Sequence, residues 1–406
     1  MPSRLPRPFL NLAWSNLAAQ SAEQLSLAAA PLVAVLALRA GPGEVGMLAA
    51  AQTLPFLLAS MPLGMLADRM PRRRLMLWAE GLRALSLFAM LIAFLSSSLT
   101  IEWLALLGFL GAIGTVGFSV VAPALVPELV PRGALALANS RLELARSAAF
   151  TAGPALAGSL VSWAGAAATF TLAAVLSTFA ILLLLRLLEP RRPSPPERHP
   201  FAEVREGASF VWHEPMLRPM LITGVIFNVS WFVLQAAYVP YAVRVLDMSA
   251  QTIGLTLAMF GAGMLAGAML TSRVVAAMPF GRAIQVGPVV SVLAASAMAA
   301  TLVFPHAALA GLSFALFGAG PMVWTIASTT LRQSVTAGPM LGRVSAVFLT
   351  ANAGARPIGA ALGGLVGSTY GESACLLVAL AGFVIQACVI LGSRITSLRR
   401  LPVPAA

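Results

Sequence analysis

The sequence predicts an all-α integral membrane protein with twelve transmembrane helices, arranged as two pseudo-symmetric bundles of six. Three observations support this fold class. Of the 406 residues, 59% are hydrophobic and only 10% are charged, whereas soluble domains carry about 25% charged residues. Twelve runs are apolar over about the 20 residues that a spanning helix needs. Arginines gather in alternate connections between these runs.

The predicted spans cover residues 10–38, 45–67, 75–96, 102–127, 142–163, 167–188, 217–243, 252–272, 283–303, 307–330, 344–366 and 373–394. We interpret the first run as a spanning helix rather than a leader peptide, since it is long and carries Asn16, Gln20 and Glu23. With both termini in the cytoplasm, the outer connections contain only Arg39 and Arg244, as the positive-inside rule requires.

The span 10–38 contains the best candidate for an ionisable functional group. Burying such a group in a membrane is costly, so Glu23 is a functional hypothesis by default. Asn16, Gln20 and Glu23 follow steps of four and three and share one helical face. We expect them to line the central cavity, where Glu23 binds a proton or a cationic substrate on one side of the membrane and releases it on the other. The alternative is a neutral Glu23 that is hydrogen-bonded to a neighbouring helix.

The connection after span 45–67 reads Gly64-Met-Leu-Ala-Asp68-Arg69-Met-Pro-Arg72-Arg73-Arg74. It resembles motif A of the major facilitator superfamily, although proline replaces a common glycine at position 71. The resemblance implies a transporter in which Asp68, Arg69, Arg72 and Arg73 form an inner gate. Gly64 would let two helices approach closely. The alternative is an ordinary positive-inside loop.

Spans 75–96 and 142–163 each contain an acid and an arginine three residues apart. Glu80 with Arg83 and Glu143 with Arg146 are interpreted as simple ion pairs near the cytoplasmic helix ends. The span 142–163 also contains Gly153-Pro154-Ala-Leu-Ala-Gly158, which resembles the antiporter motif C of the same superfamily. Proline kinks a helix and glycine permits close packing. The alternative is glycine-rich packing without a transport role.

Residues 189–215 form one long polar stretch that begins with a proline-rich, charged segment. Apolar residues then recur at helical spacing, which predicts a short amphipathic helix on the inner leaflet. This linker separates an N-terminal bundle (1–188) from a C-terminal bundle (216–406). One offset of 203 residues relates Gly64 to Gly267 and Pro154 to Pro357. Duplicated six-helix halves are typical of the superfamily.

The C-terminal half contains a polar and aromatic stripe on span 217–243. Its members suit the wall of a substrate cavity: Asn228, Trp231, Gln235 and Tyr238. Tyr241 is assigned instead to an interfacial aromatic belt, and Trp324 is a weaker cavity candidate. Arg356 precedes Pro357; it either faces the cavity, where it attracts an anionic or catecholate-like substrate, or pairs with Glu23 or a backbone carbonyl.

Several function classes are disfavoured. The three histidines are scattered, and without lysine no Walker A run can form, so we expect neither an enzyme nor an ATP-driven pump. Two cysteines in the last span make neither a disulfide framework nor a metal site. The net charge of +12 is spread over short loops, which argues against nucleic-acid binding. We expect no cofactor, with a proton gradient as the energy source.

Further runs, including Gly46 to Pro55 and Val121 to Pro131, resemble the bacterial branch of enterobactin exporters and macrolide-efflux proteins. The resemblance implies a proton antiporter of the bacterial inner membrane that exports a small amphiphilic drug or siderophore. We expect the chain to work as a monomer, since it contains both halves. Its expected partners are protons, a small molecule and the lipid bilayer. The alternatives are a lipid or lysophospholipid transporter or flippase, and a proton-coupled importer.

Overall fold

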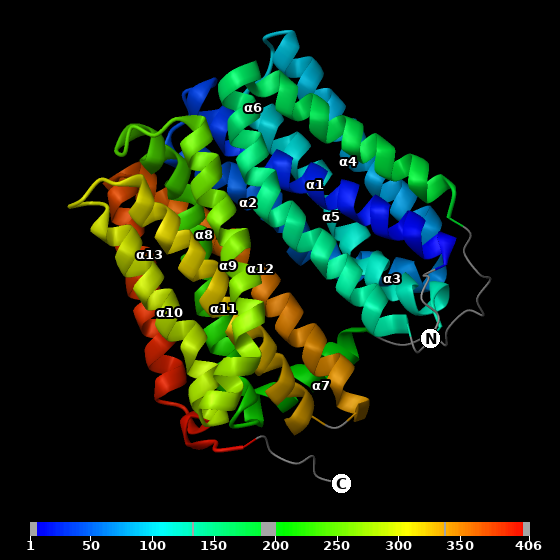
Figure 1. The fold of residues 1–406 in the computed structure, drawn as a ribbon, viewed down its shortest axis with the longest axis vertical. Coiled ribbons are helices and arrows are strands. Elements are labelled where there is room, and N and C mark those ends of the chain that lie inside the picture. The colour runs from blue at the N-terminus through cyan, green and yellow to red at the C-terminus, as the bar shows by residue number, and fades with distance from the viewer. Residues whose placement is uncertain (1–5, 132–133, 188–199, 337, 401–406) are drawn as a thin grey trace. The chain divides into compact units, whose positions relative to one another are not determined.

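A computed structural model describes residues 6–131, 134–187, 200–336 and 338–400 (Figure 1). These residues are almost entirely helical, and the helices are α1 (Arg7–Leu36), α2 (Pro42–Leu58), α3 (Ser60–Arg69), α4 (Arg72–Leu95), α5 (Ile101–Leu129), α6 (Leu135–Leu185), α7 (Pro200–His213), α8 (Leu217–Arg244), α9 (Ala250–Ala277), α10 (Phe280–Ala300), α11 (Ala307–Val335), α12 (Gly338–Tyr370), α13 (Glu372–Leu391) and the short η2 (Arg394–Ser397).

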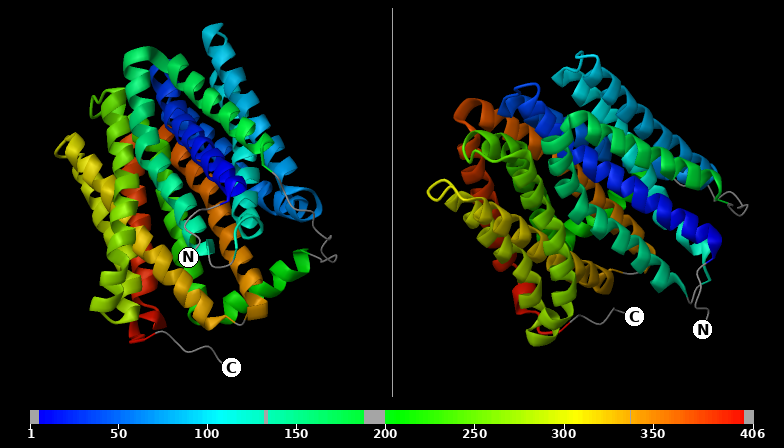
Figure 2. Two further views of the ribbon diagram at one scale, coloured as in Figure 1. Left: turned by 45° about the vertical axis from the view of Figure 1, so that its right-hand side comes forward. Right: turned by 45° about the horizontal axis from the view of Figure 1, so that its top comes forward.

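The described helices supply the predicted spans, with two differences in form. The span expected at 45–67 is divided into α2 and α3, which are bent by 40° next to Ala59. The two spans expected at 142–163 and 167–188 together make α6, which breaks at Gly165. Gly165 has φ = 79°, a conformation that favours glycine. Figure 2 shows α6 turning back on itself at this break.

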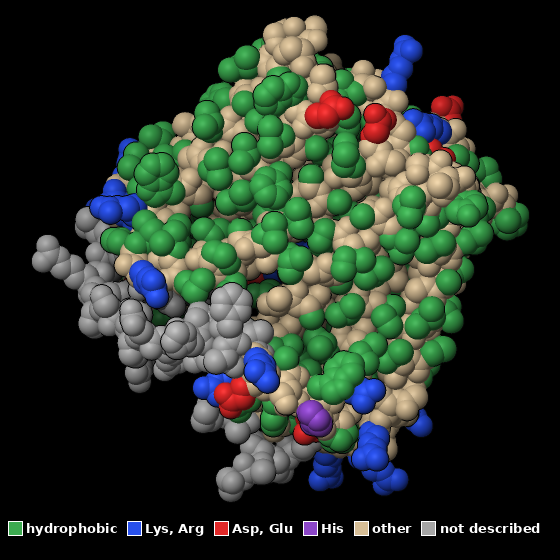
Figure 3. Space-filling model, turned by 180° about the vertical axis from the view of Figure 1, so that it is seen from behind, with side chains coloured by type: hydrophobic (Ala, Val, Ile, Leu, Met, Phe, Trp, Pro, Cys, Tyr) green, Lys and Arg blue, Asp and Glu red, His purple; other side chains and the backbone are tan. Residues whose placement is uncertain are grey.

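Eight of the described helices are each long and apolar enough to cross a membrane, and α2 with α3 makes a ninth candidate. The remaining long helices, α1 and α12, contain the polar residues singled out above, which lower their mean hydropathy. Apolar side chains cover most of the face drawn in Figure 3, and charged side chains stand toward its margins. This distribution suits a chain whose helix middles face lipid.

The chain divides into two compact units. The first contains residues 1–196 together with Met248–Ala258, and the second contains residues 197–247 and 259–406. In the first unit α1 packs along α6 and α4 packs along α5, around a core that includes Phe9, Leu12 and Phe118. In the second unit α8 packs against α12 and α13, and α10 packs against α11.

The two units repeat local features. Pro154 lies inside α6 and Pro357 lies inside α12. The chain turns at Gly165 within α6 and at Gly371, with φ = 84°, between α12 and α13. Matching prolines and matching glycine turns support the duplication that the offset of 203 residues predicts.

The helix expected within 189–215 forms as α7. Its Val211 is buried in the core of the second unit, and Glu206 accepts a hydrogen bond from Arg343 of α12 at 2.6 Å. These contacts attach α7 to the second unit, while its place on the inner leaflet stays a prediction, as does the domain boundary.

Candidate functional site

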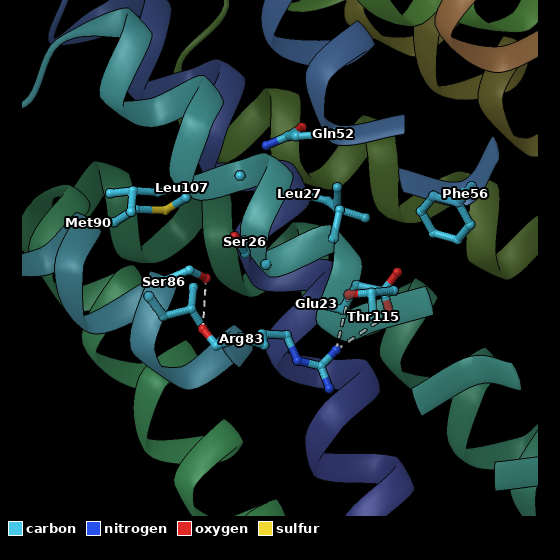
Figure 4. A pocket seen from close by; sticks show the side chains of 14 residues that line it. Glu23, Ser26, Leu27, Gln52, Phe56, Arg83, Ser86, Met90, Leu107 and Thr115 are labelled. Atoms are coloured by element: carbon cyan, nitrogen blue, oxygen red, sulfur yellow. Dashed lines mark hydrogen bonds and ion pairs between the residues drawn. The ribbon is translucent and has the colours of Figure 1, made fainter. Parts of the chain in front are cut away.

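A pocket in the first unit lies among α1, α2, α4 and α5 (Figure 4). Its empty space is about 430 Å³, including the part open to the surroundings. Its lining combines apolar, hydroxyl, amide and charged groups: Glu23, Ser26, Leu27, Gln52, Phe56, Arg83, Ser86, Leu87, Met90, Leu107, Gly108, Gly111, Ala112 and Thr115. Glu23 therefore lines a pocket inside the first unit, whereas Asn16 and Gln20 are not among these lining residues. The place of all three at a central cavity stays a prediction.

Arg83 is the central charge of this site. Arg83 is only 3% exposed and lies near the middle of α4. Its Nε donates to Glu80 Oε1 at 3.2 Å, its Nη2 pairs with Glu80 Oε2, and its Nη1 donates to Thr115 Oγ1 at 3.3 Å. The same Nη1 lies 3.9 Å from Glu23 Oε2. One guanidinium is thus shared by two carboxylates.

Glu80 is the fully buried member of the cluster. Besides Arg83, it accepts a hydrogen bond from Ser177 Oγ of α6 at 2.5 Å. Glu80 is thus held by a guanidinium on its own helix and by a hydroxyl group on α6. Glu23 differs, because its side chain is 16% exposed and its contact with Arg83 is longer. The geometry therefore separates a fixed ion pair from a carboxylate that a solute in the pocket can reach.

The sequence interpretation of Glu80 and Arg83 is correct about their pairing and wrong about their place. They are buried within a spanning helix and contact the candidate site, rather than lying near a cytoplasmic end. The signal was present, since charges within a spanning segment indicate function. What the spacing of three residues cannot reveal is the third partner, Glu23, on another helix.

Glycines on α5 make room for this cluster. Gly108, Gly111, Gly114 and Gly117 recur at intervals of three on the side of α5 that faces α2 and α4. A Cβ atom on Gly114 would collide with the backbone oxygen of Ala79 and approach Arg83, and one on Gly111 would lie 2.8 Å from Ser86 Oγ. Close packing of α4 and α5 brings the Arg83 guanidinium to Thr115.

Residues 12–360 match the family model of the Major Facilitator Superfamily. The chain belongs to this superfamily. It is thus a multi-pass membrane transporter rather than an enzyme, with the twelve-helix fold of two pseudo-symmetric six-helix bundles.

Relatives within the superfamily share most of the chain. The enterobactin exporter EntS of Salmonella choleraesuis (strain SC-B67) is 30% identical over 332 residues, which cover 79% of this chain and 77% of that protein. Its namesake from Citrobacter koseri (strain ATCC BAA-895 / CDC 4225-83 / SGSC4696) is 28% identical over 330 residues, or 79% and 76% of the two chains. The resemblance to the enterobactin-exporter branch is confirmed.

Solved structures agree with the superfamily fold. A bacterial homologue of the iron transporter ferroportin in an inward-facing state has a TM-score of 0.77 at 17% identity, covering 97% of this chain and 100% of that one. A POT family transporter in complex with 5-aminolevulinic acid has a TM-score of 0.80 at 13% identity, with coverage of 95% and 96%. At these identities the likeness concerns the fold alone.

The superfamily's motif A contributes contacts inside the first unit. Arg72 Nη1 donates to Glu128 Oε1 of α5 at 3.1 Å. Arg73 donates to the carbonyl oxygens of Leu184 and Leu185 at 3.0 and 2.6 Å. The dipole of α6 favours a cation at this C-terminal end. These contacts fasten the start of α4 to the ends of two neighbouring helices.

Other members of motif A differ in their surroundings. Arg69 is exposed, and the side chain of Asp68 lies outside those that the structure describes. Gly64 does not mark a very close helix contact in this structure, since a Cβ atom there would lie 3.9 Å from Val120. The gate assignment of this motif stays a prediction.

The glycines of the motif C-like run make close helix contacts within the first unit. A Cβ atom on Gly153 would collide with Gln24 of α1. One on Gly158 would lie 2.8 Å from the Cα atom of Gly254, at the start of α9. A Cβ atom on Gly254 would in turn collide with the backbone oxygen of Pro154. This run therefore packs α6 closely on α1 and, through backbone-to-backbone contact, on the start of α9.

The predicted stripe of α8 is mostly packed inside the second unit. The Trp231 ring lies 5.0 Å from both the Phe260 and Phe317 rings, and the Tyr238 ring lies 4.6 Å from the Phe314 ring. Tyr238 is fully buried, and Gln235 is half-buried. A cavity role for these residues stays a prediction.

The burial of Tyr241 contradicts its expected place at the membrane interface. Tyr241 is fully buried, and its hydroxyl shares a hydrogen bond of 2.8 Å with Thr301 Oγ1. The assignment to an interfacial aromatic belt is therefore wrong, because belt residues keep their polar tips at the headgroup level. Periodicity alone does not distinguish a buried tyrosine with a partner from an interfacial one.

Polar candidates of the second unit lie between α8 and α12. Asn228 Nδ2 donates to Asn352 Oδ1 at 3.2 Å, and one turn further along each helix the Arg356 guanidinium lies 6.0 Å from the centre of the Phe232 ring. Trp324 packs on Gly287 of α10. This unit thus has its own inter-helix polar contact, next to Pro357.

Proposed function

We propose that this transporter exports a small amphiphilic, siderophore-like molecule by alternating access and that an entering proton drives the export. The observation that carries the proposal is the contact of Glu23 with buried Arg83 at the wall of a pocket. The relatives named as enterobactin exporters favour a siderophore-like substrate. Their chains align with most of this one.

Glu23 is the proposed proton site. Antiport requires the proton and the substrate to exclude each other at a shared group, so that binding one releases the other. Glu80 is unsuited, since Arg83 and Ser177 already hold it in a fully buried position. Glu23 borders the pocket and retains an exposed fraction, so it can exchange a proton with solvent and contact a substrate.

Other residues have assigned roles in this proposal. Motif A, with Asp68 and Arg69, forms the inner gate, and the glycines and prolines of α6 and α12 permit rocking of the helices. The α8 stripe and Arg356 contribute to the substrate cavity. The protein works as a monomer in a bacterial inner membrane, with both termini in the cytoplasm.

The decisive experiment measures proton release from the purified transporter in weakly buffered detergent solution. Catecholate siderophores, macrolides and lipophilic cations are added in turn to the unmodified protein and to the variant Glu23→Gln. We expect a siderophore-type ligand to release protons from the unmodified protein and to release none from Glu23→Gln. The reason is that the amide cannot ionise.

The exposed pair Glu143 and Arg146 supplies a matched control in the same unit. Glu143→Gln removes a carboxylate that is half exposed and three residues from an arginine, and it should leave proton release unchanged. Proton release that persists in Glu23→Gln would remove Glu23 from coupling. Ligand binding without any proton release would argue against proton antiport and favour another coupling ion or the lipid-transport alternative.

A further inference from the structure

The last described residues fold back onto the second unit. Residues 394–400, called here the C-terminal strap, follow α13 and contact both its end and the start of α10 (Figure 1). The backbone N–H of Gly281 in α10 donates to the carbonyl oxygen of Leu398 at 2.9 Å. One turn further along α10, Gln285 Nε2 donates to Thr396 Oγ1 at 2.8 Å. The strap is thus bonded to the first turns of α10.

The place of the strap depends on Gly281. A Cβ atom there would collide with the carbonyl oxygen of Ile395 and would lie 3.0 and 3.1 Å from those of Thr396 and Leu398. Ile395 itself is fully buried in the core of the second unit. The first N–H groups of a helix have no partner inside the helix, and the strap supplies one. Packing and backbone hydrogen bonds therefore hold the strap.

This arrangement gathers five arginines at one end of the second unit. Arg273 lies one turn before the end of α9, and Arg282 lies in the first turn of α10. The strap adds Arg394, Arg399 and Arg400. All five are exposed, and the end of α9, the start of α10 and the strap share one apolar core beneath them. The result is a strongly basic surface.

The basic surface has no acidic counterpart in the part of the chain that the structure describes. There, none of its five arginines takes part in an ion pair. From residue 248 onward the sequence contains one acid, Glu372, which pairs with Arg244 at the opposite end of α13. In the first unit, by contrast, Arg72 and Arg73 bond to protein oxygens. The basic surface therefore suits an anion from outside the chain.

Apolar side chains next to the basic surface indicate which anion suits it. Met269 and Leu270 lie one turn before Arg273 and are 71% and 45% exposed, and Leu391, just before the strap, is 45% exposed. A phospholipid combines a phosphate with acyl chains, so it can contact the arginines and these side chains together. A free phosphate ion would gain nothing from the apolar contacts. Guanidinium groups bind phosphate oxygens in a bidentate manner.

We propose that the C-terminal strap, with the adjoining ends of α9 and α10, binds anionic phospholipids of the inner leaflet. The arginines bind the headgroup phosphates, and the acyl chains lie along Met269, Leu270 and Leu391. Clusters of arginines on the cytoplasmic side of spanning helices attract the anionic lipids of that leaflet. The inference uses the proposed orientation of the chain, but neither the proposed substrate nor the proposed proton coupling.

The test titrates lipids onto the purified full chain in detergent and counts the bound lipids by native mass spectrometry. The probes are phosphatidylglycerol and phosphatidylcholine with the same acyl chains. Each arginine near an anionic headgroup contributes about fivefold to the affinity. We therefore expect phosphatidylglycerol to bind about tenfold or more tightly than phosphatidylcholine. Inorganic phosphate at the same concentrations should not displace it.

Arginine variants test the charges of the basic surface. The double variant Arg399→Gln and Arg400→Gln should weaken phosphatidylglycerol binding about tenfold or more and leave phosphatidylcholine binding unchanged. The matched control, Arg39→Gln with Arg146→Gln, removes the same charge from exposed arginines of the first unit and should change neither affinity. The elution profile and the unfolding midpoint show whether each variant is folded.

A glycine variant tests the strap without removing any arginine. Gly281→Ala should displace the strap and weaken phosphatidylglycerol binding several-fold, since the arginines are no longer held together. Its control is Gly342→Ala, at an exposed glycine where an added Cβ meets no atom within 4 Å, and this variant should bind as the unmodified protein does. If Gly281→Ala fails to fold, the arginine variants still decide the proposal.

Four results would overturn the lipid surface. Equal affinity for the two lipids would remove the charge preference, and equal losses in the two arginine double variants would remove its location. Displacement by inorganic phosphate would make the surface a site for a soluble anion. Unchanged binding in folded Gly281→Ala would remove the strap from it. Because the titration needs no substrate and no gradient, its failure is distinguishable from failure of the proposed export.

Discussion

The residue scale is dominated by the cost of burying charge. Glu80 and Arg83 are each less than 5% exposed, and the pair is retained because each charge has several partners. Removing one member of a buried pair leaves an uncompensated charge, whereas exposed pairs contribute about 0–1 kcal/mol. Because Glu23 lies beside the same guanidinium, loss of the arginine and loss of Glu80 should lower the stability by different amounts.

We expect Arg83→Met to destabilise the protein by about 3–5 kcal/mol, because it leaves two carboxylates close together without their cation. Glu80→Gln should destabilise it less, since Glu23 still faces Arg83. The measurement is the unfolding midpoint in detergent. Arg146→Met, at the exposed pair with Glu143, is the control and should change the midpoint little. Equal effects at the buried and exposed pairs would contradict this account.

At the scale of elements, the close contact of α4 with α5 depends on a glycine that has no Cβ atom. Gly114 of α5 stands where a methyl group would collide with the backbone of Ala79, while Gly81 of α4 has no atom within 4 Å of an added Cβ. Both are glycines inside helices, where alanine is favoured by about 1 kcal/mol. Only the surroundings distinguish them.

Gly114→Ala should therefore destabilise the transporter by about 1–3 kcal/mol, because α4 and α5 must separate to fit the methyl group. Gly81→Ala should be neutral or slightly stabilising. Thermal unfolding of the two variants in the same detergent checks the difference. If Gly114→Ala unfolded at the midpoint of the unmodified protein, the close contact would not be needed for stability.

For the whole molecule, the proposed orientation in the membrane rests on arginine placement. The two predicted outer arginines are Arg39 and Arg244. Arg244, the last residue of α8, donates to Glu372, the first residue of α13, at 3.0 Å. Short loops that are rich in arginine stay on the cytoplasmic side, and this bias sets the orientation of the spans. Each connection then has an assigned side, which can be tested by labelling.

In a variant with Cys375→Ala and Cys388→Ala, a single cysteine is introduced at Ser98 or at Ser397. Both serines are exposed, the first between α4 and α5 and the second in η2. We expect Ser98→Cys to react with an impermeant thiol reagent added to intact cells and Ser397→Cys to react only after the membrane is opened. Labelling of Ser397→Cys in intact, unpermeabilised cells would contradict the cytoplasmic C-terminus.

The sequence by itself determined the spans, the duplicated halves and the superfamily. These follow from properties that are local along the chain, such as apolar runs, helix breakers and the motif around Gly64 to Arg74. It also singled out Glu23, because an acid within an apolar run is conspicuous. The bend between α2 and α3 was not predicted, since one apolar run continues across it.

Only the tertiary structure decided what Glu23 stands beside. Arg83 is 32 residues from Thr115, and Glu80 is 97 residues from Ser177, so no sequence spacing encodes the cluster. It forms because the glycines of α5 admit α4 and because α1 packs along α6. The burial of Tyr241 was decided in the same way, by a partner, Thr301, that lies on another segment. Side-chain partners across helices depend on how those helices pack, and this information is distributed over the whole chain.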